Sequence, residues 1–221
     1  MEKIANLLAQ VSLFKDLDKE NIREIAPHVA DLHVQRGHII SQRGEACTGF
    51  YSIVYGRVKL SFTSAQGSEK VLELAGAGQA FGEAMMFVDK PHILTAQALE
   101  DTMLLHIPTQ AVRAAIENHP RFARRMLEGL SRRLHMLLGD VEAFSLNSGT
   151  QRVIDYLTQE AEDESAEIVL PTSKTVVASR LNLTPEHFSR ILHDLVGKRL
   201  IRMQGRAILI PSVARLRAGL Y

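Results

Sequence analysis

Residues 172–196 constrain the fold more than any other stretch, because they hold two short amphipathic segments separated by a tight break. The first segment is a predicted helix over 173–181, with Thr172 as its N-cap. A short break at 182–183 follows. The apolar residues of the first segment fall on roughly one helical face: Val176, Val177 and Leu181. This pattern predicts a helix-turn-helix.

The second segment begins at Thr184, a good N-cap residue, and Pro185 takes the first helical position, where its missing N–H costs nothing. The outward face carries Glu186, Ser189 and Arg190 near the N-terminal end, where a recognition helix presents side chains to DNA bases. Arginine can donate two hydrogen bonds to guanine, and a carboxylate can accept one from the cytosine amino group. An ordinary surface helix of mixed charge is the alternative. The predicted inward face holds Phe188, Ile191, Leu192 and Leu195.

The chain after this helix supports the DNA-binding interpretation. Residues 200–210 form two apolar runs about a Gln204–Gly205 turn, which predicts a β-hairpin, and a hairpin directly after a helix-turn-helix forms a wing. From Pro171 onward the chain has nine Lys or Arg and two acidic residues, a net charge of +7. The rest of the chain has 17 basic and 23 acidic residues, a net charge of −6. This partition is the one expected for contacts to the phosphates of double-stranded DNA. The predicted contact residues are Thr172, Lys174, Thr184, Glu186, His187, Ser189, Arg190 and Arg206.

The composition limits the class of protein and the possible cofactors, but it does not indicate a function. A chain of 221 residues with 46% hydrophobic and 23% charged residues is ordinary for a globular protein of one or two domains. The single cysteine, Cys47, excludes an internal disulfide, a zinc–cysteine cluster and a four-cysteine iron–sulfur centre within one chain. No apolar run is long enough to span a bilayer, and the first residues lack a cleavage site. We therefore expect a cytoplasmic protein without membrane association.

Between residues 31 and 107 the pattern changes to short alternating runs separated by glycines. Many short strands at near-regular spacing predict a sandwich or a barrel-like roll. Two helices are expected before it, at 2–10 and at 18–29, the second with Asp18 as its cap. The predicted strands are 38–40, 49–54, 57–62, 69–74, 95–98 and 103–107.

A short helix at 109–119 is predicted to end at Pro120, and a long helix over 121–145 follows it. Spacings of 3, 4, 3, 4 and 3 residues along the long helix describe an a/d seam. A core-facing helix can show the same stripe, but polar neighbours leave this stripe narrow, which favours a dimer helix. A dimer would also present two recognition helices to a two-fold-symmetric DNA site. The seam comprises Leu127, Leu130, Leu134, Leu137, Val141 and Phe144. A further helix over 150–162 and an acidic linker at 160–164 are expected before the basic segment.

The sequence 186–190, Glu-His-Phe-Ser-Arg, and Phe81-Gly82-Glu83 before Thr95-Ala96 resemble the CRP/FNR family of bacterial transcription regulators over essentially the whole chain. The resemblance implies an α+β fold with a cyclic-nucleotide-binding-like β-roll at 1–120, a dimerisation helix at 121–147 and a winged helix-turn-helix at 148–221. It also implies RNA polymerase as a partner and activation as the usual effect. The Glu-x-x-Ser-Arg pattern belongs to the FNR branch, which implies a palindrome of TTGAT-like half-sites. Arg190 would contact guanine, Glu186 the complementary cytosine, and Ser189 a thymine or a phosphate.

The resemblance places the effector beside Gly82 and Glu83, where cyclic-nucleotide members bind the ribose. Those members need an arginine just before Thr95 to pair with the cyclic phosphate, and this chain has Leu94 there. On the dimer helix they carry polar Thr-Ser, where this chain has leucines. Cyclic AMP is therefore disfavoured. The predicted effector pocket comprises Phe81, Gly82, Glu83, Met85, Met86, Leu94, Thr95, Leu137 and Leu138.

The N-terminus has no cysteine cluster, so the iron–sulfur centre of the FNR branch is not expected. Residues 83–89, together with Gln97, resemble the nitric-oxide-responsive dissimilatory nitrate respiration regulators, a subfamily associated with haem and denitrification. This similarity implies haem as a candidate cofactor in an apolar pocket, with His135 as the candidate axial ligand of its iron by position alone. A methionine stripe is more often part of a core, and a purely structural Glu83 is the alternative.

Two other classes of protein are alternatives to a ligand-controlled regulator. One is a regulator that responds to a different small molecule or binds DNA constitutively. The other is an enzyme that uses the roll as a catalytic pocket, which needs a metal triad or an activated nucleophile. His33 and His38, which flank Arg36–Gly37, lack the His-x-His or Glu spacing of such sites. We therefore expect a protein without enzymatic activity.

Overall fold

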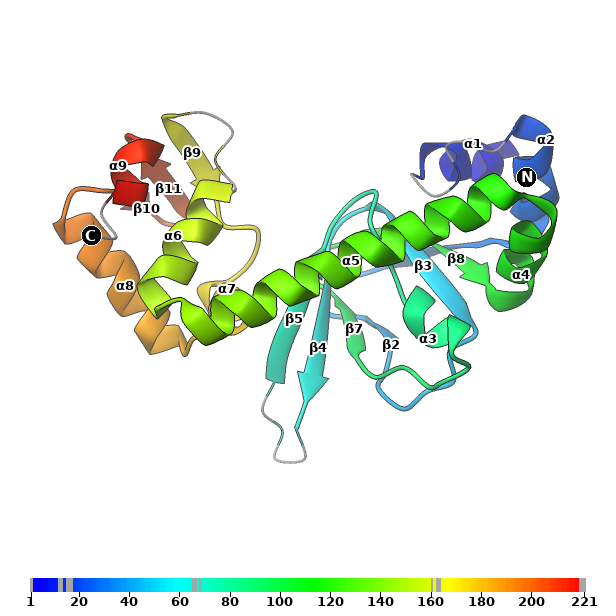
Figure 1. The fold of residues 1–221 in the computed structure, drawn as a ribbon, viewed down its shortest axis with the longest axis horizontal. Coiled ribbons are helices and arrows are strands. Elements are labelled where there is room, and N and C mark those ends of the chain that lie inside the picture. The colour runs from blue at the N-terminus through cyan, green and yellow to red at the C-terminus, as the bar shows by residue number, and fades with distance from the viewer. Residues whose placement is uncertain are drawn as a thin grey trace. The chain divides into compact units, whose positions relative to one another are not determined.

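The computed structural model describes residues 2–11, 14, 18–64, 67, 69–159, 161 and 164–218. They form two compact units, Met1–His135 and Met136–Tyr221, and the long helix α5, Pro120–Leu146, continues through the division. Figure 1 shows the elements of each unit. Within the described residues, every helix is too short or too polar to cross a membrane. The standing of residues 121–147 as a separate dimerisation segment stays a prediction about the assembled protein.

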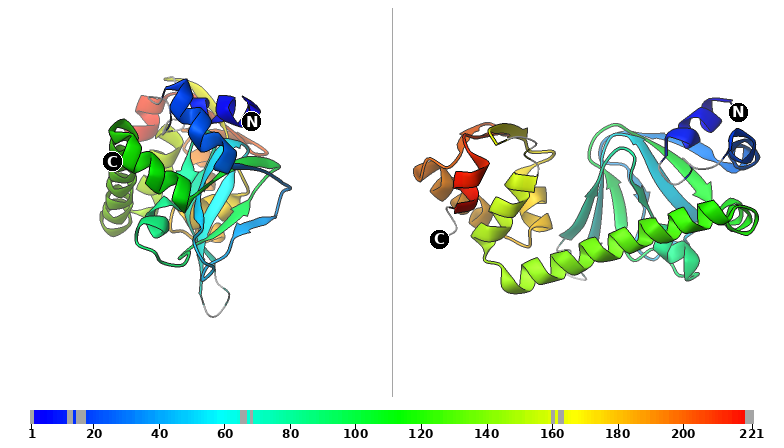
Figure 2. Two further views of the ribbon diagram at one scale, coloured as in Figure 1. Left: turned by 90° about the vertical axis from the view of Figure 1, so that its right-hand side faces the viewer. Right: turned by 45° about the horizontal axis from the view of Figure 1, so that its top comes forward.

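Two four-stranded antiparallel sheets form the centre of the N-terminal unit, and Figure 2 shows them from two further sides. The first sheet has the order β1-β8-β3-β6 and the second has the order β2-β7-β4-β5. Their facing sides bury a small apolar cluster around Ile53, Phe81 and Leu104. The strands are β1 Ala30–Val34, β2 Ile39–Ser41, β3 Gly49–Tyr55, β4 Val58–Thr63, β5 Glu69–Ala75, β6 Ala80–Phe81, β7 Thr95–Ala98 and β8 Thr102–Pro108.

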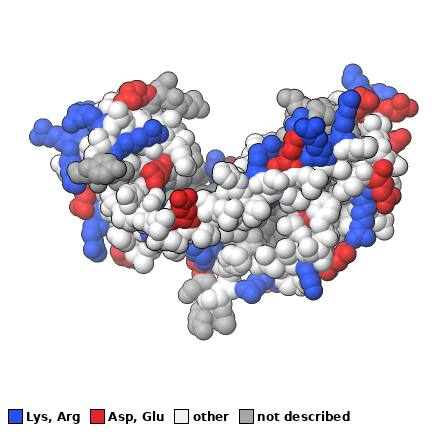
Figure 3. Space-filling model, viewed as in Figure 1, with Lys and Arg blue, Asp and Glu red and all other residues white. Residues whose placement is uncertain are grey.

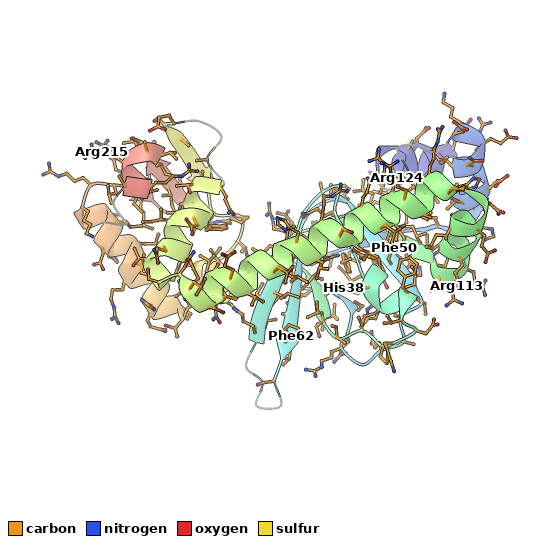
Figure 4. All side chains as sticks on the ribbon, viewed as in Figure 1. His38, Phe50, Phe62, Arg113, Arg124 and Arg215 are labelled. Atoms are coloured by element: carbon orange, nitrogen blue, oxygen red, sulfur yellow. The ribbon has the colours of Figure 1, made fainter. Side chains whose placement is uncertain are left out.

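Helices cover the other face of the first sheet and bury a second cluster. Phe50 on β3 is fully buried there, in the region where Figure 4 labels it, and Phe14 packs on Phe122 with ring centroids 5.1 Å apart. Apolar residues recur at helical spacing on these elements, so each helix has one face to bury. The helical elements of this unit are α1 Glu2–Gln10, α2 Lys19–Ile25, the 3-10 turn Ala26–His28, α3 Glu83–Phe87, α4 Thr109–Asn118 and the first part of α5.

The C-terminal unit is a helical domain with a three-stranded antiparallel sheet of order β10-β11-β9. Its core includes both helices of the helix-turn-helix and the inward residues of the sheet, such as Ile208 and Ile210. The elements are α6 Gly149–Gln159, β9 Ala166–Val169, α7 Lys174–Arg180, α8 Pro185–Gly197, β10 Arg202–Gln204, β11 Ala207–Ile210 and α9 Val213–Ala218.

The expected roll, long helix and winged helix-turn-helix are confirmed, and the predicted helices and strands are found within a few residues of their expected ends. Elements β1, β6, α3, β9 and α9 were not predicted. Asp18 precedes α2 but makes no side-chain capping hydrogen bond. The expected acidic linker at 160–164, and with it the end of the predicted helix over 150–162, lies largely outside the described residues.

Candidate functional site

The second helix of the helix-turn-helix, α8, is fixed at its N-terminus as its sequence predicts. The Thr184 hydroxyl oxygen accepts a hydrogen bond from the His187 amide at 3.2 Å, and Pro185 takes the first helical position. All four residues of the predicted inward face, Phe188, Ile191, Leu192 and Leu195, are buried. Glu186 and Arg190 are exposed and Ser189 is half-buried. The helix therefore presents a polar face beside its N-terminal end.

The first helix, α7, differs from the prediction at its cap. Ser173, not Thr172, is the N-cap, and its hydroxyl accepts from the Val176 amide at 3.4 Å. Thr172 and Lys174 are half-buried on either side of this cap. Asn182 adopts a left-handed φ of 57°, which a residue with a short polar side chain tolerates, and it forms the turn between the two helices. The sequence could not separate two adjacent hydroxyl residues that are both good caps.

Two of the predicted contact residues have side chains that face other parts of the C-terminal unit. A Cβ added to Gly149, the first residue of α6, would lie 3.1 Å from His187 Cε1, so the His187 ring lies beside the start of α6. The Arg206 guanidinium donates two hydrogen bonds to the Leu170 carbonyl oxygen, from Nε at 3.0 Å and from Nη2 at 2.6 Å. Glu186, Ser189 and Arg190 lie on the polar face of α8, and their contact with bases stays a prediction.

The surface charge follows the partition in the sequence. Figure 3 shows Lys and Arg atoms prominent on the C-terminal unit, whereas both signs are mixed on the N-terminal unit. Figure 4 labels Arg215, which projects from α9. Exposed basic residues of this unit lie on α8, after α8, on β10, in the loop after β10 and on α9: Arg190, Lys198, Arg199, Arg202, Arg206, Arg215 and Arg217. Such a surface attracts the phosphates of a nucleic acid without regard to base sequence.

The last turns of α5 are joined to the helix-turn-helix by arginines. Arg180 of α7 pairs with the Asp140 carboxylate at 2.9 Å, and both side chains are largely buried. Arg152 of α6 donates to the carbonyl oxygens of Phe144 and Asn182, at 3.4 and 3.3 Å, and its guanidinium lies over the Phe144 ring. These contacts were not predicted, because they join residues far apart in the sequence. They join the end of α5 to α7, to α6 and, through α6, to the turn at Asn182.

The Gly82–Glu83 pair lies at the start of α3. Gly82 has a left-handed φ of 95°, a conformation that favours glycine, and it lets the chain turn from β6 directly into α3. Phe81 is buried and stacks on Tyr51 with ring centroids 5.1 Å apart. Glu83 is only 7% exposed. A carboxylate with so little access to water requires a charged or hydrogen-bonding partner.

That partner is Arg133 of α5. Its Nη1 lies 2.6 Å from Glu83 Oε1 and 3.0 Å from the Ala80 carbonyl oxygen, and its Nη2 lies 2.6 Å from Glu73 Oε2 on β5. Burial alone would lower the pKa of the Arg133 guanidinium, but the two carboxylates more than offset burial and raise that pKa. Glu83 Oε2 is buried and has no hydrogen-bond partner within the part of the chain that the structure describes. The sequence placed Arg133 only among the polar neighbours of the seam, and Glu73 was not singled out.

The other predicted pocket residues have different surroundings. Met86 is buried in the same apolar cluster as Phe50, and Met85 is half-buried. Leu94 packs against the cluster between the two sheets. The Thr95 hydroxyl accepts a hydrogen bond from the Arg43 amide at 3.3 Å. Phe81, Glu83, Met86 and Leu94 are therefore packed or paired.

Along α5 the seam residues are largely uncovered in the single chain. Leu127, Leu134 and Val141 are 65%, 59% and 62% exposed, whereas Leu130, Leu137 and Phe144 are half-buried. His135 and Leu138 are also exposed, and Leu137 and Leu138 belong to the C-terminal unit. Apolar side chains exposed in a row on a helix are typical of a surface that a partner covers.

A group of titratable side chains near Gly82 and Gly49 was not predicted; His92 is buried, and His106 and Cys47 are half-buried. Burial lowers the pKa of His92, and burial together with the neighbouring His92 lowers the pKa of His106. Burial raises the pKa of the Cys47 thiol, which donates to the Gly49 carbonyl oxygen at 3.2 Å. Among the described residues, no three His, Cys, Asp or Glu side chains are grouped so as to hold a metal ion.

Two family models match the chain. The cyclic nucleotide-binding domain matches residues 31–119, and the Crp-like helix-turn-helix domain matches residues 151–218. These regions contain the two sheets with α3 and α4, and the helix-turn-helix with its wing.

Similar proteins span the whole chain. The crystal structure of DNR from Pseudomonas aeruginosa is 33% identical, with 96% of each chain covered and a TM-score of 0.51. FixK2 from Bradyrhizobium japonicum is 20% identical, with 86% of this chain and 96% of that chain covered and a TM-score of 0.77, which supports the fold alone. A CRP-like cAMP-activated global transcriptional regulator of Mycobacterium tuberculosis is 23% identical over 95% of this chain and 96% of its own length.

Proposed function

Because this chain belongs to the CRP/FNR family of DNA-binding transcription regulators, we propose that it binds palindromic DNA of TTGAT-like half-sites as a homodimer under control of a small ligand. The proposed half-site is supported by the polar face of α8, which holds Glu186, Ser189 and Arg190. Thr184 caps this helix, and four buried residues anchor its other face. Arg190 reads guanine and Glu186 accepts from the opposite cytosine.

The test compares Arg190→Ala with Arg215→Ala, which removes the same charge from α9. Fluorescence anisotropy measures binding to the TTGAT palindrome and to palindromes with a substituted guanine. Arg190→Ala reduces discrimination at that guanine by about 1–3 kcal/mol, whereas Arg215→Ala leaves the discrimination unchanged. An Arg190→Ala protein that still prefers the original guanine as strongly as the wild type would refute this role.

The dimer forms along α5. The seam supports this proposal because Leu127, Leu134 and Val141 are exposed in the single chain and recur at heptad spacing. Leu134→Glu would bury an unpaired carboxylate in the interface and disrupt it. Arg132→Glu places the same charge on an exposed neighbour and serves as the control. Analytical ultracentrifugation separates the two outcomes, and a tight Leu134→Glu dimer would move the interface elsewhere.

The effector acts on the N-terminal unit, near Gly82 and Thr95. A cyclic phosphate is disfavoured there because Leu94, which stands where a pairing arginine would be needed, packs among apolar side chains. A ligand controls DNA binding only by the difference in its affinity for two states of the protein. Equal DNA affinity with every effector tested would favour a constitutive regulator. Activation through contact with RNA polymerase is part of the same proposal.

Haem with nitric oxide is a second candidate effector, and it rests on the similarity to DNR. The residues do not fit a haem site within the N-terminal unit, because Met86 and Leu94 are packed in apolar clusters and the axial candidate His135 is exposed on α5. Anaerobic haem titration followed by nitric oxide tests it directly. Stoichiometric uptake with tighter binding to the palindrome would support a gas sensor, and loose uptake with unchanged DNA binding would exclude it.

A further inference from the structure

The tip of the wing is tied to the chain that leads into the helix-turn-helix. The hairpin of β10 and β11 closes through a two-residue loop, Gly205–Arg206, in which Gly205 has a left-handed φ of 62°. Glycine at the first position of such a loop permits the turn that matches the twist of the strands. The loop therefore presents the Arg206 side chain from a defined backbone position.

Arg206 and Leu170 are joined by side-chain and backbone hydrogen bonds. The Arg206 guanidinium donates from Nε and Nη2 to the Leu170 carbonyl oxygen, at 3.0 and 2.6 Å, and the Leu170 amide donates to the Arg206 carbonyl oxygen at 3.0 Å. The side-chain bonds carry the charge of the guanidinium, and such bonds are stronger than neutral ones. Together, the side-chain and backbone bonds form a clamp between the loop and Leu170.

The position of Leu170 shows which parts of the C-terminal unit the clamp joins. Its side chain is buried in the core of the C-terminal unit, it follows β9, and Ser173, the N-cap of α7, comes three residues later. The clamp thus holds the wing tip against the entry to the helix-turn-helix. The Leu170 carbonyl oxygen occupies Nε–H and one Nη2–H of the guanidinium, so two of its five donors and its orientation are committed within the protein.

We propose that Arg206 is a positioning residue for DNA binding: it fixes the wing against the start of the helix-turn-helix and does not serve as a direct phosphate contact. This replaces the contact role expected from the sequence. It rests on the proposed function, since the wing matters only if α8 reads DNA. A wing held in one place loses less conformational freedom when it meets the duplex, which favours binding without adding a contact.

Two substitutions separate positioning from charge. Arg206→Lys keeps the positive charge but cannot donate from two fixed nitrogens to one oxygen, whereas Arg206→Met removes both the charge and the donors. Arg202→Met is the matched control, because Arg202 is an exposed arginine on β10 of the same hairpin. Circular dichroism establishes that every variant remains folded at the assay temperature.

The first measurement is amide hydrogen exchange at Leu170, which requires no DNA. Exchange at this amide accelerates roughly tenfold in Arg206→Lys and Arg206→Met, the effect of losing a charge-assisted hydrogen bond, and stays at the wild-type rate in Arg202→Met. Wild-type exchange in Arg206→Met would overturn the clamp itself. Failure of the wild type to bind the palindrome would refute the proposed half-site, while this comparison would still test the clamp.

The second measurement is the affinity for the palindrome as a function of salt. Positioning predicts that Arg206→Lys and Arg206→Met both bind several-fold more weakly, with a slope of log K against log salt equal to that of the wild type. A direct phosphate contact predicts that lysine retains the affinity and that methionine reduces the slope by about 0.9. That second pattern, or unchanged affinity in both variants, would overturn the proposal. A purely stabilising role is excluded if affinity falls while the domain stays folded.

Discussion

Replacing Arg133 by methionine is the perturbation that most directly tests how α5 is joined to the N-terminal unit. Methionine keeps much of the apolar stem but removes the guanidinium that contacts Glu73, Glu83 and the Ala80 carbonyl oxygen. Two carboxylates would then remain close together without a cation. The variant therefore measures the free energy of unfolding that depends on the ion cluster.

The magnitude follows from burial. The side chains of Arg133, Glu73 and Glu83 are 22%, 16% and 10% exposed, so water screens the cluster only in part. Removing one partner of a buried ion pair costs about 3–5 kcal/mol, and the remaining exposure reduces this to roughly 2–3 kcal/mol. For a unit of this size the loss lowers the melting temperature by roughly 5–10 °C.

Calorimetry combined with hydrogen exchange in β5 assigns the change to the N-terminal unit. Arg132→Met is the matched control, because Arg132 is the exposed neighbour on the same helix, and its substitution changes stability by about 0.5 kcal/mol or less. Adding Glu73→Gln and Glu83→Gln to Arg133→Met removes the unpaired charges and restores most of the loss. Equal melting temperatures for the Arg133 and Arg132 variants would refute the reasoning. So would a triple variant no more stable than Arg133→Met alone.

Three further predictions concern other features of the fold. Gly139→Ala stabilises α5 by about 0.5–1 kcal/mol in urea unfolding, because nothing lies within 4 Å of the added Cβ; a loss of stability would contradict this. The pKa values of His92 and His106 are lowered in the folded state, so the unfolded state binds more protons below the ordinary pKa of 6.5. The stability that these histidines contribute is therefore complete above pH 6.5 and falls as the pH drops towards the lowered pKa values. His92→Gln makes the free energy of unfolding less dependent on pH, and an unchanged dependence would count against this account. Because burial raises its pKa, Cys47 reacts with iodoacetamide at pH 8 more slowly than free cysteine does, and an equal or faster rate would disprove this.

Local patterns in the sequence predicted the elements that have one clear apolar face. The spacing of Phe188, Ile191, Leu192 and Leu195 gave α8 its buried side, and the cap at Thr184 gave its start. Strand β1, Ala30–Val34, was not predicted because it is short and carries exposed polar residues, which blur the alternation. Strand β6 has only two residues, too few for a periodic signal.

The effector site was harder to predict because its decisive contacts are not local. Glu83 lies 50 residues from Arg133, and Glu73 lies 60 residues from it. A Gly-Glu pair predicts a turn into a helix, but it does not indicate which cation the carboxylate will meet. The same limit applies to Arg206, whose basic side chain suggested phosphate, whereas its partner is a backbone oxygen 36 residues earlier.

Under the proposed function, helix α5 is the element through which a ligand would influence DNA binding. In the N-terminal unit it contributes Arg133 to the cluster with Glu83, and in the C-terminal unit it contributes Asp140 to the pair with Arg180. These attachments are seven residues apart, about 10 Å along a helix, and Gly139 between them lowers local helix propensity. We expect a ligand that donates a hydrogen bond to Glu83 Oε2, which has no such partner among the described residues, to change how strongly Arg133 is held. Under the proposed ligand control, a change at Arg133 would pass along the backbone of α5 to Asp140, and so to Arg180 of α7.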